Sequence, residues 1–339
     1  MNPRIVFMGT PEFASGCLQA LVDAGLNVVA VVTMPDKPIG RGQKTGMSDV
    51  KRLALELNLP VLQPQKLKDP VFLQELEGFR ADLQIVVAFR MLPQEVWSMP
   101  RLGTFNLHAS LLPRYRGAAP IQRAIWNGET ETGVTTFLLD KDLDTGAILH
   151  QEKVAISPEE TAGSLHDKLL SIGAPMVVKT ARELFAGTIT PQPQLVAENE
   201  KLPDAPKIFK KDCLIDFKLP AKKVLQQIKA LSPYPGAIAC LQQFSTQKSI
   251  PIKLLDACLD QENTKSYEQG VILSDNKRFM KIVCGDGLSV AITRLQLPGK
   301  KQLTTEELLR GFKFDTAKDL FTLGVINNQQ GETVGYQRS

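Results

Sequence analysis

The stretch RIVFMGTPEFASGCLQALVDAGLNVVAVVT, residues 4–33, decides the fold. Its first apolar run ends in Gly-Thr-Pro, so Thr10 is expected to be the N-cap of a helix and Pro11 its first-turn proline. Gly25 can close that helix, and residues 28–33 form a second, nearly continuous apolar run. Between them apolar residues keep helical spacing, at Phe13, Cys17, Leu18, Leu21 and Val22. The pattern predicts a β-α-β unit.

The same alternation continues along the front of the chain. Helical segments at 53–57 and 73–76 alternate with buried strands in QIVVAF, residues 84–89, and GTFNLH, residues 103–108. Residues 1–189 are therefore expected to form a doubly wound, mostly parallel, Rossmann-like α/β sheet. Ligands of such sheets bind at the carboxyl ends of the strands, which is where Asn106 and His108 fall.

The C-terminal part of the chain differs in composition and in its pattern of apolar residues. The proline-rich, polar stretch at 187–206 predicts a linker, placed at 190–206, before a C-terminal domain at 207–339. A helical segment at 220–231 is followed by short β-rich runs at roughly ten-residue spacing, which is typical of a small barrel. An OB-like β-barrel is the preferred form.

Composition narrows the class of protein. The 339 residues are 43% apolar and 22% charged, as in globular proteins with two domains. The five cysteines are scattered and form no C-x-x-C pair, so we expect a reducing cytoplasm. No signal peptide or membrane span is expected.

Charge is unevenly distributed. Residues 1–206 carry 20 Lys and Arg against 23 Asp and Glu, whereas residues 207–339 carry 20 against 13. A basic C-terminal domain fits either a solvated surface or a polyanion-binding module.

Several cofactor chemistries are disfavoured. Pro11 stands where a dinucleotide-binding loop needs its second glycine, and no ATP-binding P-loop sequence occurs. The three histidines, His108, His150 and His166, form no close pair, so no metal is expected. What remains is Asn106, His108 and the loop LLDKDLDTGAIL with Asp140, Asp142 and Asp144. A strand histidine can equally be a core residue, and aspartates before glycine often make turns.

The motif N-x-H-x-S-L-L-P-x-x-x-G at 106–117, with L-D-T-G at 143–146, resembles the folate-dependent formyltransferase family. Further blocks are similar to the branch that acts on methionyl-tRNA: FMGTPEFA at 7–14, TMPDKPIGRGQK at 33–44, APKIFKKDCLID at 205–216, IKALSPYPGA at 228–237, GDGLSV at 285–290 and LPGKK at 297–301. The resemblance implies transfer of a formyl group from 10-formyltetrahydrofolate to the α-amine of methionine esterified to initiator tRNA.

The resemblance also implies the catalytic residues. Free α-amines have a pKa near roughly 7.7 to 8, so the enzyme needs no powerful base. Asn106 would donate to the oxyanion of the tetrahedral intermediate, and His108 would donate to the same oxygen or relay a proton. Asp144 would orient the imidazole and favour its charged form.

Binding residues follow in the same way. The folate pocket is expected to include Ser110, Leu111, Leu112, Pro113, Val87, Ala88, Phe89 and Asp140. Two departures affect it: Phe89-Arg90 stands where the family often has Tyr-Gly, and Asp142 replaces a common glycine.

For tRNA, residues 33–46 are expected to form a mobile loop that enters the acceptor stem, with Arg41 at its tip. The basic residues expected to contact tRNA are Lys37, Arg41 and Lys44 in this loop, and Lys207, Lys210 and Lys211 beyond the linker. A monomer without membrane contact is expected.

Three alternatives remain open. Glycinamide ribonucleotide transformylases share N-x-H but have one domain. A formyltetrahydrofolate hydrolase would carry a similar barrel and use water in place of tRNA. A tRNA-binding module with an inactive site would lack turnover, although intact Asn106, His108 and Asp144 disfavour that reading.

Overall fold

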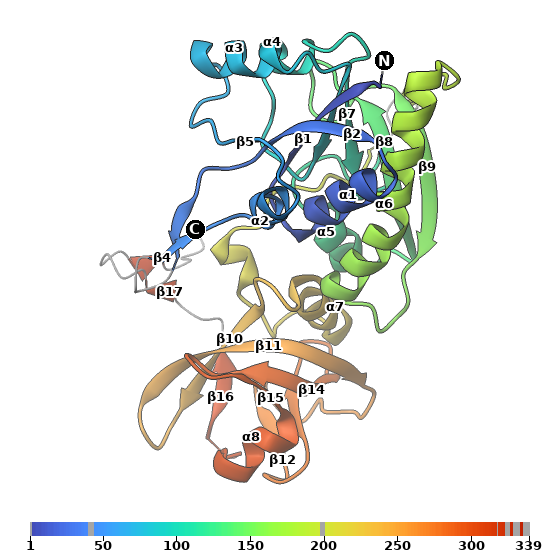
Figure 1. Cartoon of the computed structure of the whole chain (residues 1–339). Helices are drawn as coiled ribbons and strands as arrows, with labels where there is room; N and C mark the ends of the chain where they lie inside the picture. The colour runs from blue at the N-terminus through green and yellow to red at the C-terminus, as the bar shows by residue number, and fades with distance from the viewer. Residues whose placement is uncertain are drawn as a thin grey trace. The chain divides into compact units, whose positions relative to one another are not determined.

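The structure is a computed structural model that describes residues 2–39, 44–196, 201–316, 318–322, 326–327 and 333–334. It consists of two compact units (Figure 1). Unit 1 comprises Met1–Pro120, Thr130–Ile156 and Leu165–Pro206, and unit 2 comprises Ile121–Glu129, Ser157–Ser164 and Lys207–Ser339. Each unit therefore draws on separate stretches of the chain.

Unit 1 is built on a seven-stranded sheet with the order β5-β2-β1-β6-β7-β8-β9. Its parallel strands are β1 (Arg4–Gly9), β2 (Asn27–Val32), β5 (Val61–Leu62), β6 (Leu83–Val87) and β7 (Thr104–His108). The last two, β8 (Glu131–Leu138) and β9 (Ile148–Ala155), are antiparallel. The predicted mostly parallel sheet is thus confirmed.

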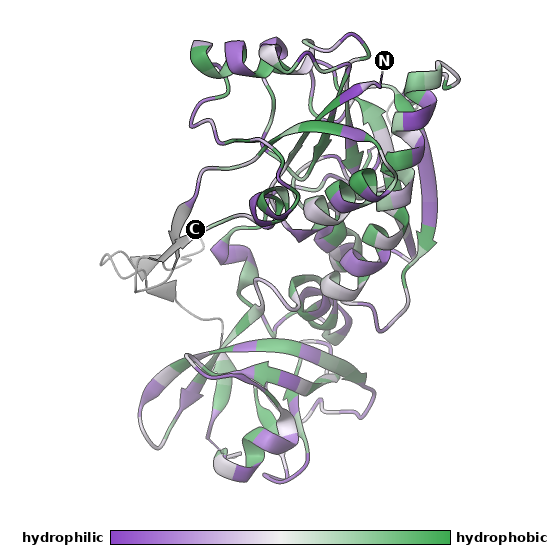
Figure 2. Ribbon diagram, in the orientation of Figure 1, coloured by the Kyte–Doolittle hydropathy of each residue, from purple (hydrophilic) through white to green (hydrophobic). Residues whose placement is uncertain are grey.

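Helices cover both faces of this sheet. They are α1 (Glu12–Asp23), α2 (Asp49–Glu56), α3 (Pro70–Gly78), α4 (Gln94–Trp97) and α6 (Ala162–Ala186). On one face Val6 and Met8 share an apolar cluster with Phe72 of α3 and Val96 of α4. On the other, α6 approaches so closely that a Cβ at Gly173 would lie 2.9 Å from Leu107. Figure 2 shows the resulting band of hydrophobic strands between amphipathic helices.

The first helix differs in one detail from the prediction. Its N-cap is Pro11, without a side-chain cap bond, so the assignment of Thr10 as N-cap is wrong. Because Pro11 is already extended, with φ −83° and ψ 179°, the helix starts one residue later. Gly25, with φ +71°, closes the helix as predicted, since its N–H donates to Val22 O at 2.9 Å.

The segment predicted as a loop at 33–46 contains a short β-ribbon. β3 (Lys37–Ile39) and β4 (Lys44–Gly46) pair antiparallel, with Lys37 opposite Gly46. The glycines and prolines of this stretch concealed the alternation that would have predicted strands.

Unit 2 is centred on a second sheet with the order β12-β13-β14-β11-β10-β16. The strands are β10 (Ala237–Gln243), β11 (Lys248–Asp260), β12 (Ile272–Ser274), β13 (Met280–Val283), β14 (Ser289–Gln296) and β16 (Leu320–Thr322), with β15 (Gln302–Thr304) beside β14. An antiparallel bridge between Val271 and Leu320 joins the two ends of the sheet. The predicted small antiparallel barrel is therefore confirmed.

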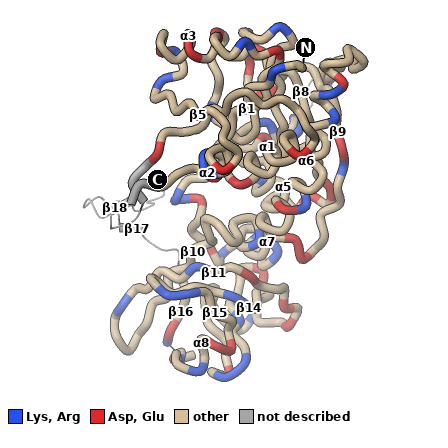
Figure 3. Tube along the Cα trace, in the orientation of Figure 1, with Lys and Arg blue, Asp and Glu red and all other residues tan. Residues whose placement is uncertain are grey.

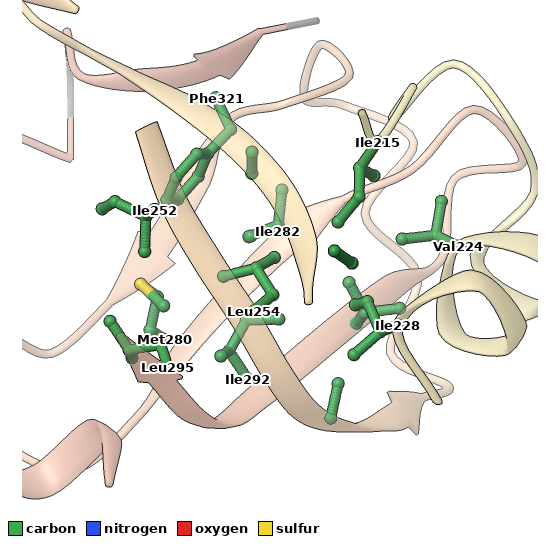
Figure 4. Packing of buried hydrophobic residues seen from close by; sticks show 14 of the residues in the cluster. Ile215, Val224, Ile228, Ile252, Leu254, Met280, Ile282, Ile292, Leu295 and Phe321 are labelled. Atoms are coloured by element: carbon green, nitrogen blue, oxygen red, sulfur yellow. The ribbon is translucent and has the colours of Figure 1, made fainter. Parts of the chain in front are cut away.

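Unit 2 contains further helices and a second, two-stranded ribbon. They are α5 (Pro120–Asn127), η1 (Lys210–Cys213), α7 (Ala221–Leu231), α8 (Thr305–Gly311) and a ribbon of β17 (Ile326–Asn327) and β18 (Thr333–Val334). Ile228 of α7 belongs to the same apolar cluster as Leu254, Ile282 and Phe321 from the strands (Figure 4). None of the helices in the described ranges is long and apolar enough to cross a membrane.

Candidate active site

Strand β7 carries two of the expected catalytic side chains. Asn106 and His108 are two residues apart, so both project from the same face of the sheet. Asn106 lies opposite Val86 of β6 and Phe137 of β8, and His108 lies opposite Thr135. The pair therefore sits where the parallel part of the sheet meets its antiparallel edge.

His108 is held between two acceptors. Its Nε2 lies 2.8 Å from Tyr115 O, and because a carbonyl oxygen only accepts, Nε2 is the donor. Its Nδ1 lies 3.8 Å from Asp144 Oδ2, with both side chains at most 10% exposed. The contact that orients the ring is thus made by Tyr115, while Asp144 stands beside the ring without a direct hydrogen bond.

Asp144 has a partner of its own. Its Oδ2 accepts from the Gly117 N–H at 2.8 Å, which fixes the carboxylate to the loop after the SLLP segment. A Cβ at Gly146 would lie only 1.7 Å from Leu138 O, so the glycine of L-D-T-G lets the loop pack against β8. The spacing of this motif therefore places the carboxylate beside the imidazole.

Asn106 contributes an unsatisfied polar atom. Its Oδ1 is buried and has no hydrogen-bond partner within the described part of the chain. Thr10 Oγ1, at the end of β1, is in the same state. Most buried polar atoms in proteins have a hydrogen-bond partner, which can be a protein group, water or a ligand, so these two atoms at the strand ends are open to such a partner.

Three residues around this site have left-handed backbone. Ala88, Tyr115 and Asp144 have φ values of +46°, +59° and +53°. Such conformations cost side chains other than glycine roughly 1–2 kcal/mol per residue and tend to gather at functional sites. The distortion at Tyr115 accompanies the turn whose carbonyl receives His108.

The SLLP segment is fastened through polar atoms. Thr135 Oγ1 donates to Ser110 O at 2.6 Å and accepts from Leu112 N at 3.2 Å, and Gln151 Nε2 donates to Leu112 O at 2.9 Å. Leu112 is buried, whereas Leu111 lies over Gly133, where a Cβ would be 2.4 Å from Leu111 Cδ2. Pro113 follows, half-buried, at the start of the loop to Tyr115.

The stretch after β6 lies at the carboxyl end of the strand next to β7 and forms a second side of the candidate site. Val87 is buried, Ala88 is exposed and Phe89 is half-buried. Arg90, at the family's glycine position, donates from Nη1 to Gln65 O at 3.0 Å and from Nη2 to Pro64 O. Burial lowers the pKa of this guanidinium. The arginine thus ties this stretch to the one before α3.

The aspartate loop is built on its own turn. Asp140 Oδ1 accepts from Asp142 N at 3.1 Å and from Thr145 Oγ1 at 2.7 Å. Asp142 is absent from the residues with positive φ in the described chain, so replacing the family's glycine does not require left-handed backbone there. Asp140 therefore has a structural use in addition to any contact with folate.

Sequence reasoning missed residues that support the site from a distance. Gln194, in the predicted linker, accepts from Arg116 Nη2 at 2.6 Å and donates to the carbonyls of Asp144 and Gly146 at 2.9 Å. Ala205 accepts from Ala119 N at 3.1 Å. Only the alternating glutamines of TPQPQ hinted at an ordered segment, because such long-range contacts leave no local pattern.

The expected tRNA contacts fall in different places. Lys207, Lys210 and Lys211 are exposed in unit 2, and Lys207 Nζ lies 5.9 Å from the centre of the Phe209 ring. Figure 3 shows the many Lys and Arg residues of this unit. Arg41 lies outside the described residues, as do the side chains of Lys37 and Lys44, whose backbones belong to the ribbon.

Comparison with known proteins agrees with this arrangement. Residues 3–180 match the family described as Formyl transferase, and residues 207–313 match Formyl transferase, C-terminal domain. The chain belongs to the formyl transferase family. A methionyl-tRNA formyltransferase of Bacteroides thetaiotaomicron is 50% identical over 317 residues, covering 91% of this chain and 96% of the relative. One from Flavobacterium johnsoniae is 48% identical, covering 93% and 98%.

Solved structures support the same fold. The sugar 3N-formyl transferase WlaRD matches with a TM-score of 0.58 and 20% identity, covering 89% of this chain and all of that one. HypX from Aquifex aeolicus matches with a TM-score of 0.61 and 22% identity, covering 93% of this chain and 49% of that one. No group of three His, Cys, Asp or Glu residues that could hold a metal occurs in the ranges that the structure describes.

Proposed function

We propose that this formyl transferase moves the formyl group of 10-formyltetrahydrofolate to the α-amine of methionine esterified to initiator tRNA. The observation that carries the proposal is the 50% identity to a methionyl-tRNA formyltransferase over both units. The geometry of Asn106, His108 and Asp144 supports it, because it supplies the groups that acyl transfer to an amine requires.

The reaction balances without an added reagent. The neutral amine attacks the formyl carbon, the carbonyl electron pair moves to oxygen, and the intermediate collapses by breaking the bond to N10. The proton from the incoming amine goes to N10, leaving tetrahydrofolate and formylmethionyl-tRNA. Asn106 donates its amide to the oxyanion, a contribution worth roughly a hundred- to a thousandfold in rate.

His108 is the proposed proton carrier. Its Nε2–H is committed to Tyr115 O, and its Nδ1 faces the Asp144 carboxylate at 3.8 Å, so a proton taken up during transfer would lie beside a negative charge. Reaching the oxyanion or N10 requires exchange of one of these contacts for substrate, as is common when a substrate-free site closes. Asp144 would stabilise the positive charge that develops on the ring while it holds the transferred proton.

The folate co-substrate fits the residues around Asn106. We assign its pocket to Val87, Ala88 and Phe89 on one side and to Ser110, Leu111, Leu112 and Pro113 on the other, with Asp140 near the loop of Asp144. Apolar walls with a few polar groups suit a pteridine ring. The assignment is supported by Asn106 Oδ1, a buried acceptor that has no hydrogen-bond partner in the described chain and is open to a donor on the ligand.

Initiator tRNA is the proposed acceptor. Arg41, Lys37 and Lys44 would meet the acceptor stem, and Lys207, Lys210 and Lys211 would meet phosphates elsewhere on the tRNA. We further propose that the protein works as a monomer in a reducing cytoplasm, which suits its five free cysteines.

The test is to incubate the purified protein with methionyl-tRNA and 10-formyltetrahydrofolate and to measure formylmethionine. Formate release that is independent of tRNA would instead show a hydrolase. Binding of tRNA without turnover would show a module with an inactive site. Omitting either substrate in turn is the matched control.

A further inference from the structure

A closed set of polar contacts lies at the root of the β3–β4 ribbon. Lys51 Nζ donates to Asp36 Oδ2 at 2.5 Å and to Gln63 Oε1 at 2.7 Å. Gln63 Nε2 completes the set by donating to Asp36 Oδ1 and to Met34 O, both at 2.8 Å. We refer to Asp36, Lys51 and Gln63 as the root cluster.

The root cluster joins the two ends of the ribbon. Asp36 immediately precedes β3, and Lys51 lies in the first turn of α2, shortly after β4 ends at Gly46. A second link runs parallel to it, because the hydroxyls of Thr33 and Ser48 lie 2.8 Å apart. Ser48 also caps α2 by accepting from Lys51 N at 3.1 Å. The segment before β3 and the segment after β4 are thus both held to the rest of unit 1 by hydrogen bonds.

The root cluster differs from an ordinary surface ion pair. The Lys51 and Asp36 side chains are only 17% and 22% exposed, whereas those of Lys68 and Glu95 are 70% and 49% exposed. Shielded pairs with several hydrogen bonds hold geometry better than exposed pairs, which salt and solvent weaken. Hydrogen bonds from Lys51 and Gln63 also hold the Asp36 pKa below its usual range.

The contacts also decide what Lys51 does. By sequence it is one more basic residue near a stretch expected to touch tRNA, yet its ammonium already has two protein acceptors. Moving it to a phosphate would leave Asp36 with Gln63 as its one side-chain partner among the residues that the structure describes. Lys51 therefore acts as a tether, by which we mean a link between Asp36 and Gln63 within the protein.

We propose that Asp36, Lys51 and Gln63 are positioning residues that fix the root of the ribbon and so present its basic residues to the tRNA acceptor stem. The inference rests on the proposed function. A ribbon free to pivot at its root would place those residues correctly only part of the time, and misplacement by an ångström can cost a large factor in rate.

The experiment compares Lys51→Met and Asp36→Asn in steady-state formylation of methionyl-tRNA. Each variant should lower kcat/KM about tenfold, mainly by raising KM for tRNA. Calorimetric binding of tetrahydrofolate and the melting temperature should stay at wild-type values. Lys68→Met, which breaks the exposed pair with Glu95, is the matched control and should keep wild-type kinetics.

The sign of the Asp36→Asn effect separates a tether from a direct phosphate contact. Freeing Lys51 for phosphate would preserve or improve tRNA binding, and Lys51→Met alone would then reduce the salt slope by about one. A tether predicts equal losses in the two variants, no further loss in the double variant, and little added loss in an Arg41→Ala background.

Two results would overturn the inference. One is an Asp36→Asn variant that binds tRNA as well as the wild type, and the other is additive loss in the double variant. Failure of the wild type itself to formylate methionyl-tRNA would instead remove the proposed function, and the inference with it. Should Lys51→Met fold poorly, Asp36→Asn and Gln63→Leu carry the same test.

Discussion

The strand ends of unit 1 and the barrel of unit 2 differ in where residues other than glycine adopt unfavourable backbone conformations. At the strand ends, Ala88, Tyr115 and Asp144 adopt left-handed backbone, and Asn106 keeps a buried oxygen unpaired within the described chain. In the barrel, the left-handed residues other than glycine are Gln247 and Asn276, both in turns between strands. The barrel also has a buried oxygen without a partner in the described chain, Ser289 Oγ on β14, so the two regions differ in backbone conformation and not in unpaired polar atoms. The unfavourable backbone conformations gather at the strand ends, where we propose that the reaction takes place.

Burial shows the same contrast. The strands of the barrel direct Leu254, Ile282 and Phe321 into a continuous apolar core, each no more than 2% exposed. The sheet of unit 1 buries His108 and Asp144 as well, at 6% and 9% exposure. The barrel also buries Asp319, at 3% exposure, but its two oxygens accept the backbone N–H groups of Phe244 at 2.8 Å and Asp315 at 3.0 Å, so that carboxylate is used for structure. His108 and Asp144 instead face each other at the strand ends, so their substitution should affect activity more than folding.

Alanine in place of Asn106, His108 or Asp144 should give the largest effect. Each change should lower kcat about a hundredfold or more, because an oxyanion donor or a proton carrier is lost. Single-turnover formylation measures it, with circular dichroism to show that the fold persists. His166→Ala is the matched control, since His166 contacts the Phe13 ring at 5.2 Å and the Asp167 carboxylate. A variant with near wild-type turnover would remove that residue from the catalytic set.

The places of these residues in the fold show which features of a site can be predicted from sequence patterns. Asn106 and His108 follow from a buried strand and a motif, because parallel strand ends gather ligands. Tyr115 and Gln194 do not, since one acts through its backbone carbonyl and the other crosses about fifty residues to reach Asp144 and Gly146. The apolar runs of the barrel also allow its strands to be predicted. The strand at Lys37–Ile39 could not be predicted, because its proline and the neighbouring glycines are typical of a loop.

The barrel should respond in the opposite way to the strand ends. Leu254→Ala should lower the free energy of unfolding by about 2–5 kcal/mol, the usual cost of a buried cavity. Below the melting transition its kcat should equal that of the wild type. Leu259→Ala, on the same strand but 37% exposed, should change stability by less than about 0.5 kcal/mol. Urea unfolding and formylation assays on the same preparations test both regions, and a large fall in kcat for Leu254→Ala would contradict the division.

A smaller effect should come from relieving backbone strain. Ala88→Gly should raise the free energy of unfolding by up to about 1 kcal/mol, because glycine tolerates φ +46° without a Cβ clash. Asn58→Gly should gain less, since asparagine visits φ +54° more readily. If the strain at Ala88 helps to shape the folate pocket, only Ala88→Gly should also raise KM for the formyl donor. Equal kinetics in both variants would show that the strain is incidental.

The smallest effect concerns the thiols, which probe whether the strand ends open in the absence of substrate. Burial raises the pKa of Cys17 on α1 and of Cys284 in the barrel to about 12, so both thiols should resist alkylation at neutral pH. Cys258 on β11 is exposed and should take up a single equivalent of iodoacetamide without loss of activity. Five equivalents should react in urea, and Cys258→Ser should abolish labelling of the folded protein. Cys17 is buried on α1, the helix that directly follows the strand ending at Gly9. Labelling of Cys17 at a rate near that of Cys258 would therefore mean that α1 separates from the sheet. The unpaired Thr10 and Asn106 atoms would then reflect a loosely closed edge, and not a site held ready for substrate.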